Sequence, residues 1–323
     1  MKIAMLINRE NFERYSKWRN SKWELIHMGN GDIDADAVVA TGANVLIVDA
    51  ITKIGADIIS KIPALKLIHS QGVAFNAIDI DSARNAGVYV CNCAGMNAQA
   101  VAEQAVMLLL SLLKSFRHNE DMVYAGRQME AKTACFKEGL PELYGSRVGL
   151  VGFGAIGREF ATRVKPFGCE LFYYKQSGDA GVSYAAYMPL EELYATCDII
   201  SLHVPVTPET TNMINKETLK QFKKGAILVN TARGELMDHK SVTQALISGQ
   251  LGGLCSDTLA PEPFLLDNPL ISGLPDEVRR RVTLSPHIAG ISAGFFSRAY
   301  AHIEKNIEAV ERGERAKCIV NGL

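Results

Sequence analysis

Short apolar runs rich in β-branched residues alternate along this chain with longer stretches in which apolar and polar positions follow helical spacing. The short runs predict buried strands, and the longer stretches predict amphipathic helices. Strands that alternate with helices are typical of βαβ units and parallel sheets. The expected strands are residues 2–7, 44–48, 65–69 and 88–91, and then 147–151, 170–174, 198–203, 226–230, 254–257 and 282–284.

An apolar helix separates the two series of strands. Asn97 is a suitable N-cap for a helix over residues 97–116, which is apolar on nearly every side. We therefore expect it to be buried between layers, or against another domain or subunit. The polar residues 117–145 are expected to be irregular. Residues 292–312 predict a last helix, and residues 318–320 predict a strand that returns to the first domain.

Composition and charge exclude several classes of protein. Apolar residues make up 48% and charged residues 21% of the 323 positions, with a formal net charge of −1, which gives no electrostatic footprint for nucleic acid or a membrane surface. The longest apolar stretch, residues 105–113, is too short to span a membrane, and the run at residues 3–7 is too short for a signal peptide. The seven cysteines lack C-x-x-C spacing, which favours reduced thiols over a disulfide or metal site. We expect a cytoplasmic protein without a metal.

A glycine-rich turn opens the second series. Gly152, Gly154 and Gly157 form G-x-G-x-x-G directly after an apolar strand and before a helix. The first glycine permits a tight turn, the second lets the backbone approach a pyrophosphate, and the third lets helix and strand pack closely. Ala155 and Ile156 start the helix, whose N-terminal N–H groups suit phosphate. The pattern predicts a dinucleotide-binding Rossmann domain, and a purely structural turn is the alternative.

The residue that follows the second strand of this series departs from the usual fingerprint. An acidic residue normally stands there and binds the adenosine ribose hydroxyls, but this chain has Lys175, followed by Gln176 and Ser177. A cation removes the repulsion toward a 2′-phosphate and can pair with it. We therefore expect NADP to be favoured modestly over NAD. The alternative is a solvated lysine in an NAD enzyme.

Three later segments each place a polar residue just past an expected strand end, where ligands bind in such folds. The first carries Arg233, whose guanidinium suits bidentate binding of a carboxylate. The second carries Asp257 and Glu262, and the third carries His287. Alone, a surface arginine, a loop glutamate or a capping histidine would explain each of them. Their occurrence together, in this order and after the glycine turn, favours a shared functional role.

Together these segments resemble the D-2-hydroxyacid dehydrogenase family, which includes glycerate, phosphoglycerate, lactate and glyoxylate/hydroxypyruvate enzymes. The resemblance runs from residues 72–79 through residues 100–103 to the segments above, and Arg233 and Glu262 have the family's spacing. It implies an α/β protein with two doubly wound parallel-sheet domains. These would be a discontinuous, flavodoxin-like substrate domain of residues 1–96 with 291–323, and a Rossmann nucleotide-binding domain of residues 97–290.

The resemblance also implies roles. Arg233 would bind the substrate carboxylate and polarise the C2 carbonyl, His287 would exchange a proton with the C2 oxygen, and Glu262 would orient and stabilise the imidazolium. The backbone of Gly72 and Val73 would contact the substrate carboxylate. Asp257 would hold the nicotinamide carboxamide. The other residues placed at the cofactor are His203, Val204 and Pro205 on the adenine side, Thr231, Ala232 and Gly290.

The resemblance therefore predicts an NAD(P)-dependent enzyme that moves a hydride between the cofactor and C2 of a small 2-oxo or 2-hydroxy acid. It implies a homodimer with its site in the cleft between the domains. A nucleotide-sensing corepressor of the same family, which binds protein partners, is an alternative. Formate or phosphite is another possible substrate, although the complete Arg/Glu/His set favours 2-oxo acids. The sequence does not identify the acid. For Arg279, Arg280 and Arg281, a solvated face is favoured over an anion contact.

Overall fold

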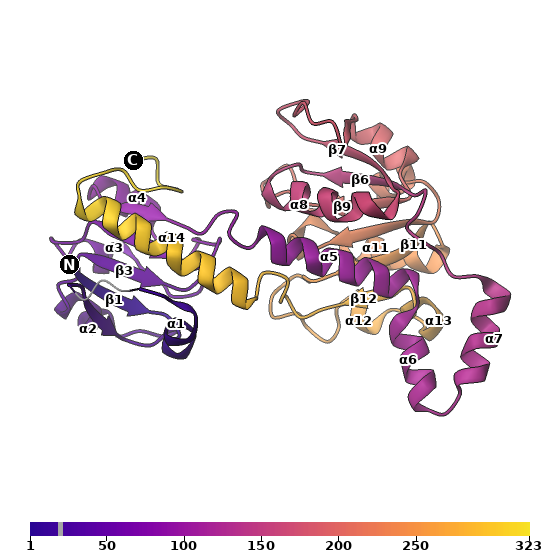
Figure 1. Ribbon diagram of the computed structural model, residues 1–323, viewed down its shortest axis with the longest axis horizontal. Coiled ribbons are helices and arrows are strands. Elements are labelled where there is room, and N and C mark those ends of the chain that lie inside the picture. The colour runs from indigo at the N-terminus through magenta and orange to yellow at the C-terminus, as the bar shows by residue number, and fades with distance from the viewer. Residues whose placement is uncertain (19–21) are drawn as a thin grey trace. The chain divides into compact units, whose positions relative to one another are not determined.

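The computed structural model describes residues 1–18 and 22–323, which form two compact units (Figure 1). Unit 1 consists of Met1–Asn97 and Ile291–Leu323, and unit 2 consists of Ala98–Gly290. Each unit has a parallel sheet with helices, which confirms the predicted α/β fold class. No helix in the described part of the chain is long and apolar enough to cross a membrane.

Unit 1 has a five-stranded parallel sheet in the order β2-β1-β3-β4-β5, the strand order of flavodoxin-like folds. Its strands are β1 Lys2–Leu6, β2 Glu24–His27, β3 Val45–Val48, β4 Leu67–Ser70 and β5 Tyr89–Cys91. Its helices are α1 Arg9–Tyr15, α2 Ala35–Ala40, α3 Ala56–Ile59, α4 Ile80–Asn85 and α14 Ala293–Glu311. Strand β2 was not predicted, because it is a half-exposed edge strand with only two apolar residues.

Helix α14 returns from the end of the chain to complete the core of unit 1. Tyr300, Ile303 and Ile307 are fully buried in the same cluster as Ile3 and Met5 of β1. The predicted strand at residues 318–320 is reduced to a single antiparallel bridge between Cys91 and Ile319. That bridge and α14 make unit 1 discontinuous in sequence.

Unit 2 has a seven-stranded parallel sheet in the order β12-β11-β10-β9-β6-β7-β8. Its strands are β6 Arg147–Val151, β7 Glu170–Tyr174, β8 Ala186–Tyr187, β9 Ile199–Leu202, β10 Ala226–Asn230, β11 Leu251–Ser256 and β12 Val282–Leu284. Its α-helices are α5 Ala98–Leu113, α6 Phe116–Tyr124, α7 Gln128–Glu138, α8 Ala155–Val164, α9 Leu190–Thr196, α10 Lys216–Gln221, α11 His239–Ser248, α12 Pro269–Ser272 and α13 Asp276–Arg279. The strand order reverses between β6 and β9, which opens a ligand crevice at the carboxyl ends of those strands.

The expectation of an irregular segment over residues 117–145 was wrong. Helices α6 and α7 occupy most of it and extend away from the sheet of unit 2 (Figure 1). Met122 is the buried residue of α6 and Ala131 that of α7, so neither helix carries the apolar stripe by which a helix is read from sequence. The two-residue strand β8 was missed because it is exposed at the edge of the sheet.

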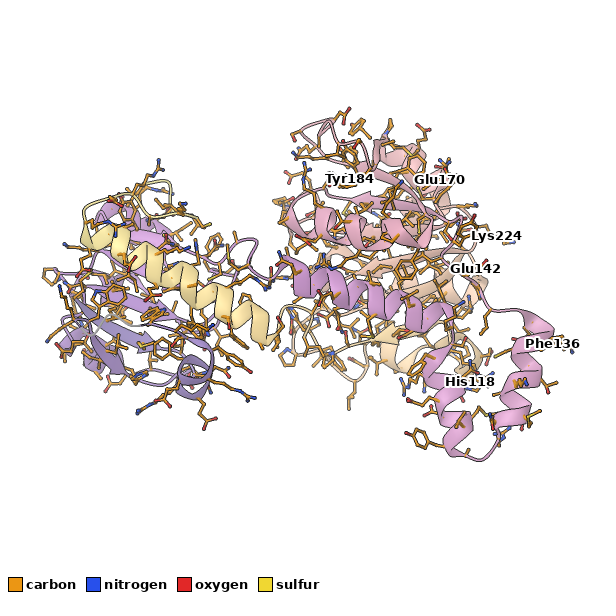
Figure 2. The ribbon with its side chains drawn as sticks, viewed as in Figure 1. His118, Phe136, Glu142, Glu170, Tyr184 and Lys224 are labelled. Atoms are coloured by element: carbon orange, nitrogen blue, oxygen red, sulfur yellow. The ribbon has the colours of Figure 1, made fainter. Side chains whose placement is uncertain are left out.

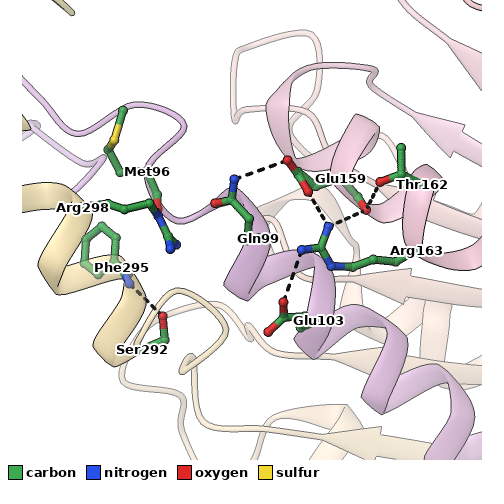
Figure 3. A network of polar contacts seen from close by, with 9 residues as sticks. All are labelled: Met96, Gln99, Glu103, Glu159, Thr162, Arg163, Ser292, Phe295 and Arg298. Carbon is green, nitrogen blue, oxygen red and sulfur yellow. Dashed lines mark hydrogen bonds and ion pairs between the residues drawn. The ribbon is translucent and has the colours of Figure 1, made fainter.

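Helices α5 and α8 pack together on one face of the unit 2 sheet. Leu109 of α5 and Phe160 of α8 are fully buried in one cluster with strands β6 and β7. Polar contacts join the same two helices (Figure 3): Arg163 forms ion pairs with Glu103 of α5 and Glu159 of α8, and Gln99 donates to Glu159. This packing fixes α8, and therefore the glycine turn from which α8 begins.

Candidate active site

The candidate residues of unit 2 follow strands of one parallel sheet, and parallel strands end at the same edge. Ordered along that edge, the residues are His287 after β12, Asp257 after β11, Arg233 after β10, His203 after β9, Gly152 after β6 and Lys175 after β7. Glu262 lies farther along the loop after β11. The edge therefore divides into a half that carries Arg233, Glu262 and His287 and a half that carries the glycine turn and Lys175.

His287 and Glu262 form a close pair. His287 Nδ1 lies 2.7 Å from both Oε1 and Oε2 of Glu262, and the side chains are 35% and 55% exposed. Because an ionised carboxylate only accepts hydrogen bonds, Nδ1 carries the hydrogen and donates it. The other ring nitrogen, Nε2, is then the atom that can bind or release a proton.

Asp257 holds the backbone on which His287 stands. Its carboxylate, 1% exposed, accepts hydrogen bonds from the N–H of Ile288 at 3.1 Å, from the N–H of Ala289 at 2.8 Å and from the Ser285 hydroxyl. Its carbonyl accepts from His287 N at 2.7 Å. His287 has a φ of 55°, in the left-handed region that non-glycine residues rarely adopt.

The turn that carries Arg233 lies against the loop that leads to Glu262. A Cβ on Gly234 would lie 2.4 Å from Ala260 N, so glycine is required for this contact. Asn230 Nδ2 donates to Arg233 O at 2.8 Å and shapes the turn. Arg233 is half-buried, and its Nη1 donates to Ala232 O at 2.7 Å, which leaves the remaining guanidinium donors for a ligand.

The sequence prediction missed Asn268, which secures the Glu262 loop. Asn268 is buried, donates to Ala260 O at 3.2 Å and to His239 Nδ1 at 2.9 Å, and accepts from Leu270 N at 3.0 Å as the N-cap of α12. His239 lies at the start of α11, in the segment that follows the Arg233 turn. An asparagine directly before Pro269 is a recognisable N-cap signal in the sequence. Its contact with His239 joins two segments that are distant in the sequence, and no local sequence pattern indicates such a contact.

The glycine turn fits a dinucleotide. Gly152 has a φ of 99°, and a Cβ there would lie 2.5 Å from His203 O. A Cβ on Gly157 would lie 2.4 Å from Gly152 O, whereas one on Gly154 meets nothing within 4 Å. No side chain caps the N-terminus of α8, which leaves its first-turn N–H groups, at Ala155 and Ile156, without an acceptor in the described part of the chain. These features suit a pyrophosphate.

Two buried polar atoms just past the carboxyl ends of β9 and β10 have no hydrogen-bond partner in the described part of the chain. They are His203 Nδ1 and Thr231 Oγ1. His203 Nε2 lies 3.0 Å from Ser201 Oγ, and burial lowers the pKa of His203 to about 3, so its ring is neutral near pH 7. Orphaned polar atoms at a strand edge are the donors and acceptors that a bound ligand would satisfy.

The other predicted cofactor residues are located as follows. Val204, with Cγ1 2.9 Å from the position of a Cβ on Gly152, packs on the glycine turn and is followed by Pro205. Ala232 is half-buried beside Arg233, and Gly290 is the last residue of unit 2.

Lys175 follows β7 and is half-buried. Among the described residues, none forms a hydrogen bond or an ion pair with its ammonium group. The nearest acid in sequence, Asp179, accepts hydrogen bonds from the Tyr173 hydroxyl and from Gly181 N at 2.9 Å. The carboxylate of Asp179 is thus engaged elsewhere and does not pair with Lys175.

In unit 1, the loop after β4 has open N–H groups. The carbonyls of Gly72, Val73 and Ala74 accept hydrogen bonds, whereas the N–H groups of Val73 and Ala74 meet no acceptor in the described part of the chain. The donors to these carbonyls are Cys93 N at 2.8 Å, Asn92 Nδ2 at 2.7 Å and Ser70 Oγ at 2.7 Å, respectively. Two neighbouring unpaired N–H groups form a site for an anion such as a carboxylate.

The three arginines before β12, Arg279, Arg280 and Arg281, lie in different surroundings. Arg281 donates to the carbonyls of Leu246, Leu251 and Gly252, at 2.7, 3.2 and 3.3 Å, and so joins α11 to β11. Arg279 and Arg280 are exposed, as a solvated face would be, and Arg279 lies 3.6 Å from Asp276.

Comparison with known proteins identifies the family. Residues 106–289 match the family described as "D-isomer specific 2-hydroxyacid dehydrogenase, NAD binding domain". The chain belongs to this family. It is 33% identical over 294 residues to a glyoxylate reductase of Korarchaeum cryptofilum, covering 89% of this chain and 83% of the relative. It is 34% identical over 275 residues to a hydroxypyruvate reductase of Thermotoga maritima, covering 83% of each.

The fold agrees with that membership. The solved structure of a D-2-hydroxyisocaproate dehydrogenase matches with a TM-score of 0.86 at 26% identity, covering 100% of both chains. The family confirms the predicted class of activity: this D-2-hydroxyacid dehydrogenase transfers a hydride between a nicotinamide cofactor and a small 2-oxo or 2-hydroxy acid. It also confirms that the chain binds NAD(H) through its Rossmann-type domain.

Proposed function

We propose that this dehydrogenase reduces small 2-oxo acids with His287 as the proton donor. The observation that carries the proposal is the contact of His287 Nδ1 with both oxygens of Glu262 at 2.7 Å. The carboxylate fixes the tautomer and stabilises the imidazolium, which leaves Nε2 to donate a proton to the C2 oxygen. The nicotinamide, when bound, supplies the hydride to C2 in reduction and accepts it in oxidation.

Each unit offers donors that suit a substrate carboxylate. The free guanidinium donors of Arg233 form a planar fork that matches a carboxylate and polarise the neighbouring carbonyl. The unpaired N–H groups of Val73 and Ala74, in the loop that begins at Gly72, supply a second set of donors. A substrate held by its carboxylate and, at the C2 oxygen, by His287 would present one face of C2 to the hydride.

NADPH is the cofactor that this chain favours, by a modest margin. The unpaired ammonium of Lys175 and the polar Gln176 and Ser177 stand where an acid would repel a 2′-phosphate. We assign Thr231, Ala232, Asp257 and Gly290 to the surroundings of the nicotinamide. Asp257 Oδ2 accepts a hydrogen bond from one donor, Ala289 N, and can accept a second one from the carboxamide. Neutral His203 with Val204 and Pro205 would line the adenine side.

We infer that the enzyme acts as a homodimer in the cytoplasm. Helices α6 and α7 expose apolar side chains: Phe136, labelled on α7 in Figure 2, is among them. Phe136 is 92% exposed, and Tyr124 at the end of α6 is 85% exposed. Apolar surface of this kind favours burial against a second copy. Light scattering after size exclusion should give a dimer mass, and a monomer at all concentrations would contradict the inference.

A reduction screen tests the proposal. Glyoxylate and hydroxypyruvate, the substrates in the names of the two relatives, should be reduced with NADPH, and pyruvate and longer 2-oxo acids complete the panel. Turnover of a 2-oxo acid that is lost in His287→Ala supports the proposed function. Cofactor binding with no turnover on any member would contradict it and favour a nucleotide-sensing role.

A further inference from the structure

A chain of hydrogen bonds runs from α5 to the loop of His287. Gln104 on α5 donates from Nε2 to Ser285 Oγ at 3.0 Å, and the Ser285 hydroxyl donates to Asp257 Oδ1. An ionised carboxylate cannot donate, so the direction is fixed: amide to hydroxyl to carboxylate. Hydrogen bonds to a charged group are stronger than neutral ones, and they hold that group in one orientation.

The carboxylate at the end of this chain holds a conformation that would otherwise be unfavourable. His287 has a φ of 55°, and the N–H groups of His287, Ile288 and Ala289 all end on Asp257. A non-glycine residue in the left-handed region persists only where its surroundings fix it. Asp257 supplies that fixation, and its Oδ1 depends on Ser285 for one of its two donors.

We propose that Gln104 and Ser285 are positioning residues of the reaction. They fix the carboxylate of Asp257, which holds the backbone of His287 so that its ring meets Glu262 through Nδ1 and presents Nε2 to the substrate. The proposal rests on the proposed role of His287. Neither residue touches the substrate, so both act on the rate through the orientation of the imidazole.

The consequence is a defect in turnover without a defect in binding. Without the Ser285 hydroxyl, Asp257 Oδ1 loses a donor and the His287 loop samples other conformations. A misplacement of about 1 Å at a reacting group costs on the order of 100-fold in rate. We expect Ser285→Ala to lower kcat by about 10- to 100-fold, with the KM for glyoxylate and the Kd for NADPH within about twofold of the parent.

The experiment compares four variants with the parent enzyme. Ser285→Ala removes the hydroxyl, Ser285→Thr retains it, and Gln104→Leu removes only the first donor. Ser248→Ala is the matched control, because its hydroxyl is exposed and its hydrogen bonds, to Ala245 O and from Gln250 N, stay at the end of α11. Steady-state reduction of glyoxylate gives kcat and KM, cofactor fluorescence gives the Kd for NADPH, and circular dichroism checks folding and Tm.

A further measurement does not depend on turnover. The ring nitrogens of His287, labelled with ¹⁵N and assigned by their loss in His287→Ala, report on its tautomer and on its contact with Glu262. In Ser285→Ala and Gln104→Leu the hydrogen on Nδ1 should exchange faster with water, because the ring spends less time at the carboxylate. Ser285→Thr and Ser248→Ala should give the exchange rate of the parent.

The results separate the two proposals. A lower kcat with unchanged KM in Ser285→Ala, restored in Ser285→Thr, supports the positioning role. A lower Tm with parental kcat and an unchanged exchange rate of the Nδ1 hydrogen of His287 overturns it, because the hydroxyl would then be structural only. Should Ser285→Ala not fold, Gln104→Leu decides by the same readouts. If His287→Ala keeps its turnover, the proposed function fails, whereas the nitrogen spectrum still tests whether Ser285 positions the ring.

Discussion

The two ends of the unit 2 sheet edge are built on different principles. At the β10–β12 end, Arg233, Glu262 and His287 stand on loops held in place by hydrogen bonds of Asn230, Asp257 and Asn268 and by the close contact of Gly234 with Ala260. At the β7 end, Lys175 projects without a partner in the described part of the chain, and the only acid nearby in sequence is engaged by Tyr173. The loops at the first end are held by internal contacts, whereas the second end carries a lysine without a partner among the described residues.

The difference follows from what each end has to do. Proton transfer requires atoms placed within a few tenths of an ångström, so the groups that carry it are fixed before the substrate arrives. Choosing between two cofactors that differ by a phosphate requires only a difference in local charge, which a flexible lysine provides. Substitutions at the fixed end should therefore cost far more than substitutions at the free end.

The largest effect is expected for His287→Ala. Losing the positioned general acid should reduce turnover of a 2-oxo acid by about 10²–10⁴-fold, with cofactor binding little changed. Single-turnover reduction and fluorescence titration with NADPH measure the two quantities. Near-parental turnover would remove His287 from its role.

Arg233→Lys should have the next largest effect, although it keeps the charge. A lysine cannot form the planar fork to a carboxylate, and a lost charge-assisted hydrogen bond of about 1.5–3 kcal/mol corresponds to about a 10- to 100-fold loss in kcat/KM. KM should rise and kcat should fall, since the same group is proposed to touch the carboxylate and the carbonyl of the substrate. Unchanged steady-state kinetics would exclude Arg233 from the site.

Glu262→Gln should lower the rate by less. The amide oxygen can still accept from His287 Nδ1, but a hydrogen bond to a charged group contributes about 1 kcal/mol more than a neutral one, so kcat for reduction should fall by about 10-fold with KM little changed. Steady-state reduction of a 2-oxo acid checks this, with Glu277→Gln, an exposed position on α13, as a matched control. A parental kcat would make Glu262 structural.

The smallest effect is expected at the free end. One half-exposed lysine–phosphate contact contributes roughly 1 kcal/mol, or about a fivefold to tenfold preference for NADPH, and the preference should shrink as salt rises. Lys175→Asp should reverse the order of the two cofactors. A clear NADH preference in the parent enzyme would mean that Lys175 faces solvent.

The strands that were predicted correctly have local sequence patterns that indicate them. The strands before Gly152, Arg233 and His287 are apolar runs that end in polar or glycine residues, and parallel pairing then brings their ends to one edge. The pairing of Glu262 with His287 was expected from family resemblance, because two loops after different strands have no shared local pattern.

What the sequence did not predict depends on distant contacts. Asn268, Gln104 and Ser285 act through partners far along the chain, and their residue types are common in loops and helices. Helices α6 and α7 bury too little to show an apolar stripe, and the edge strands β2 and β8 are too exposed for an apolar run. The spacing of apolar residues indicates which face of an element is buried, so elements that bury few residues are not recognised from the sequence.

The discontinuity of unit 1 sets an order of events during synthesis of the protein. Residues 1–97 leave the ribosome before unit 2, whereas α14 leaves it after unit 2, although Tyr300, Ile303 and Ile307 of α14 lie in the buried cluster of unit 1. Unit 2 is continuous and can complete its core while that cluster still lacks α14. Nascent chains expose apolar surface until the missing partner arrives, which makes them clients of chaperones. A chain cut off after unit 2 would keep a finished nucleotide-binding unit joined to a first unit that has an uncovered core.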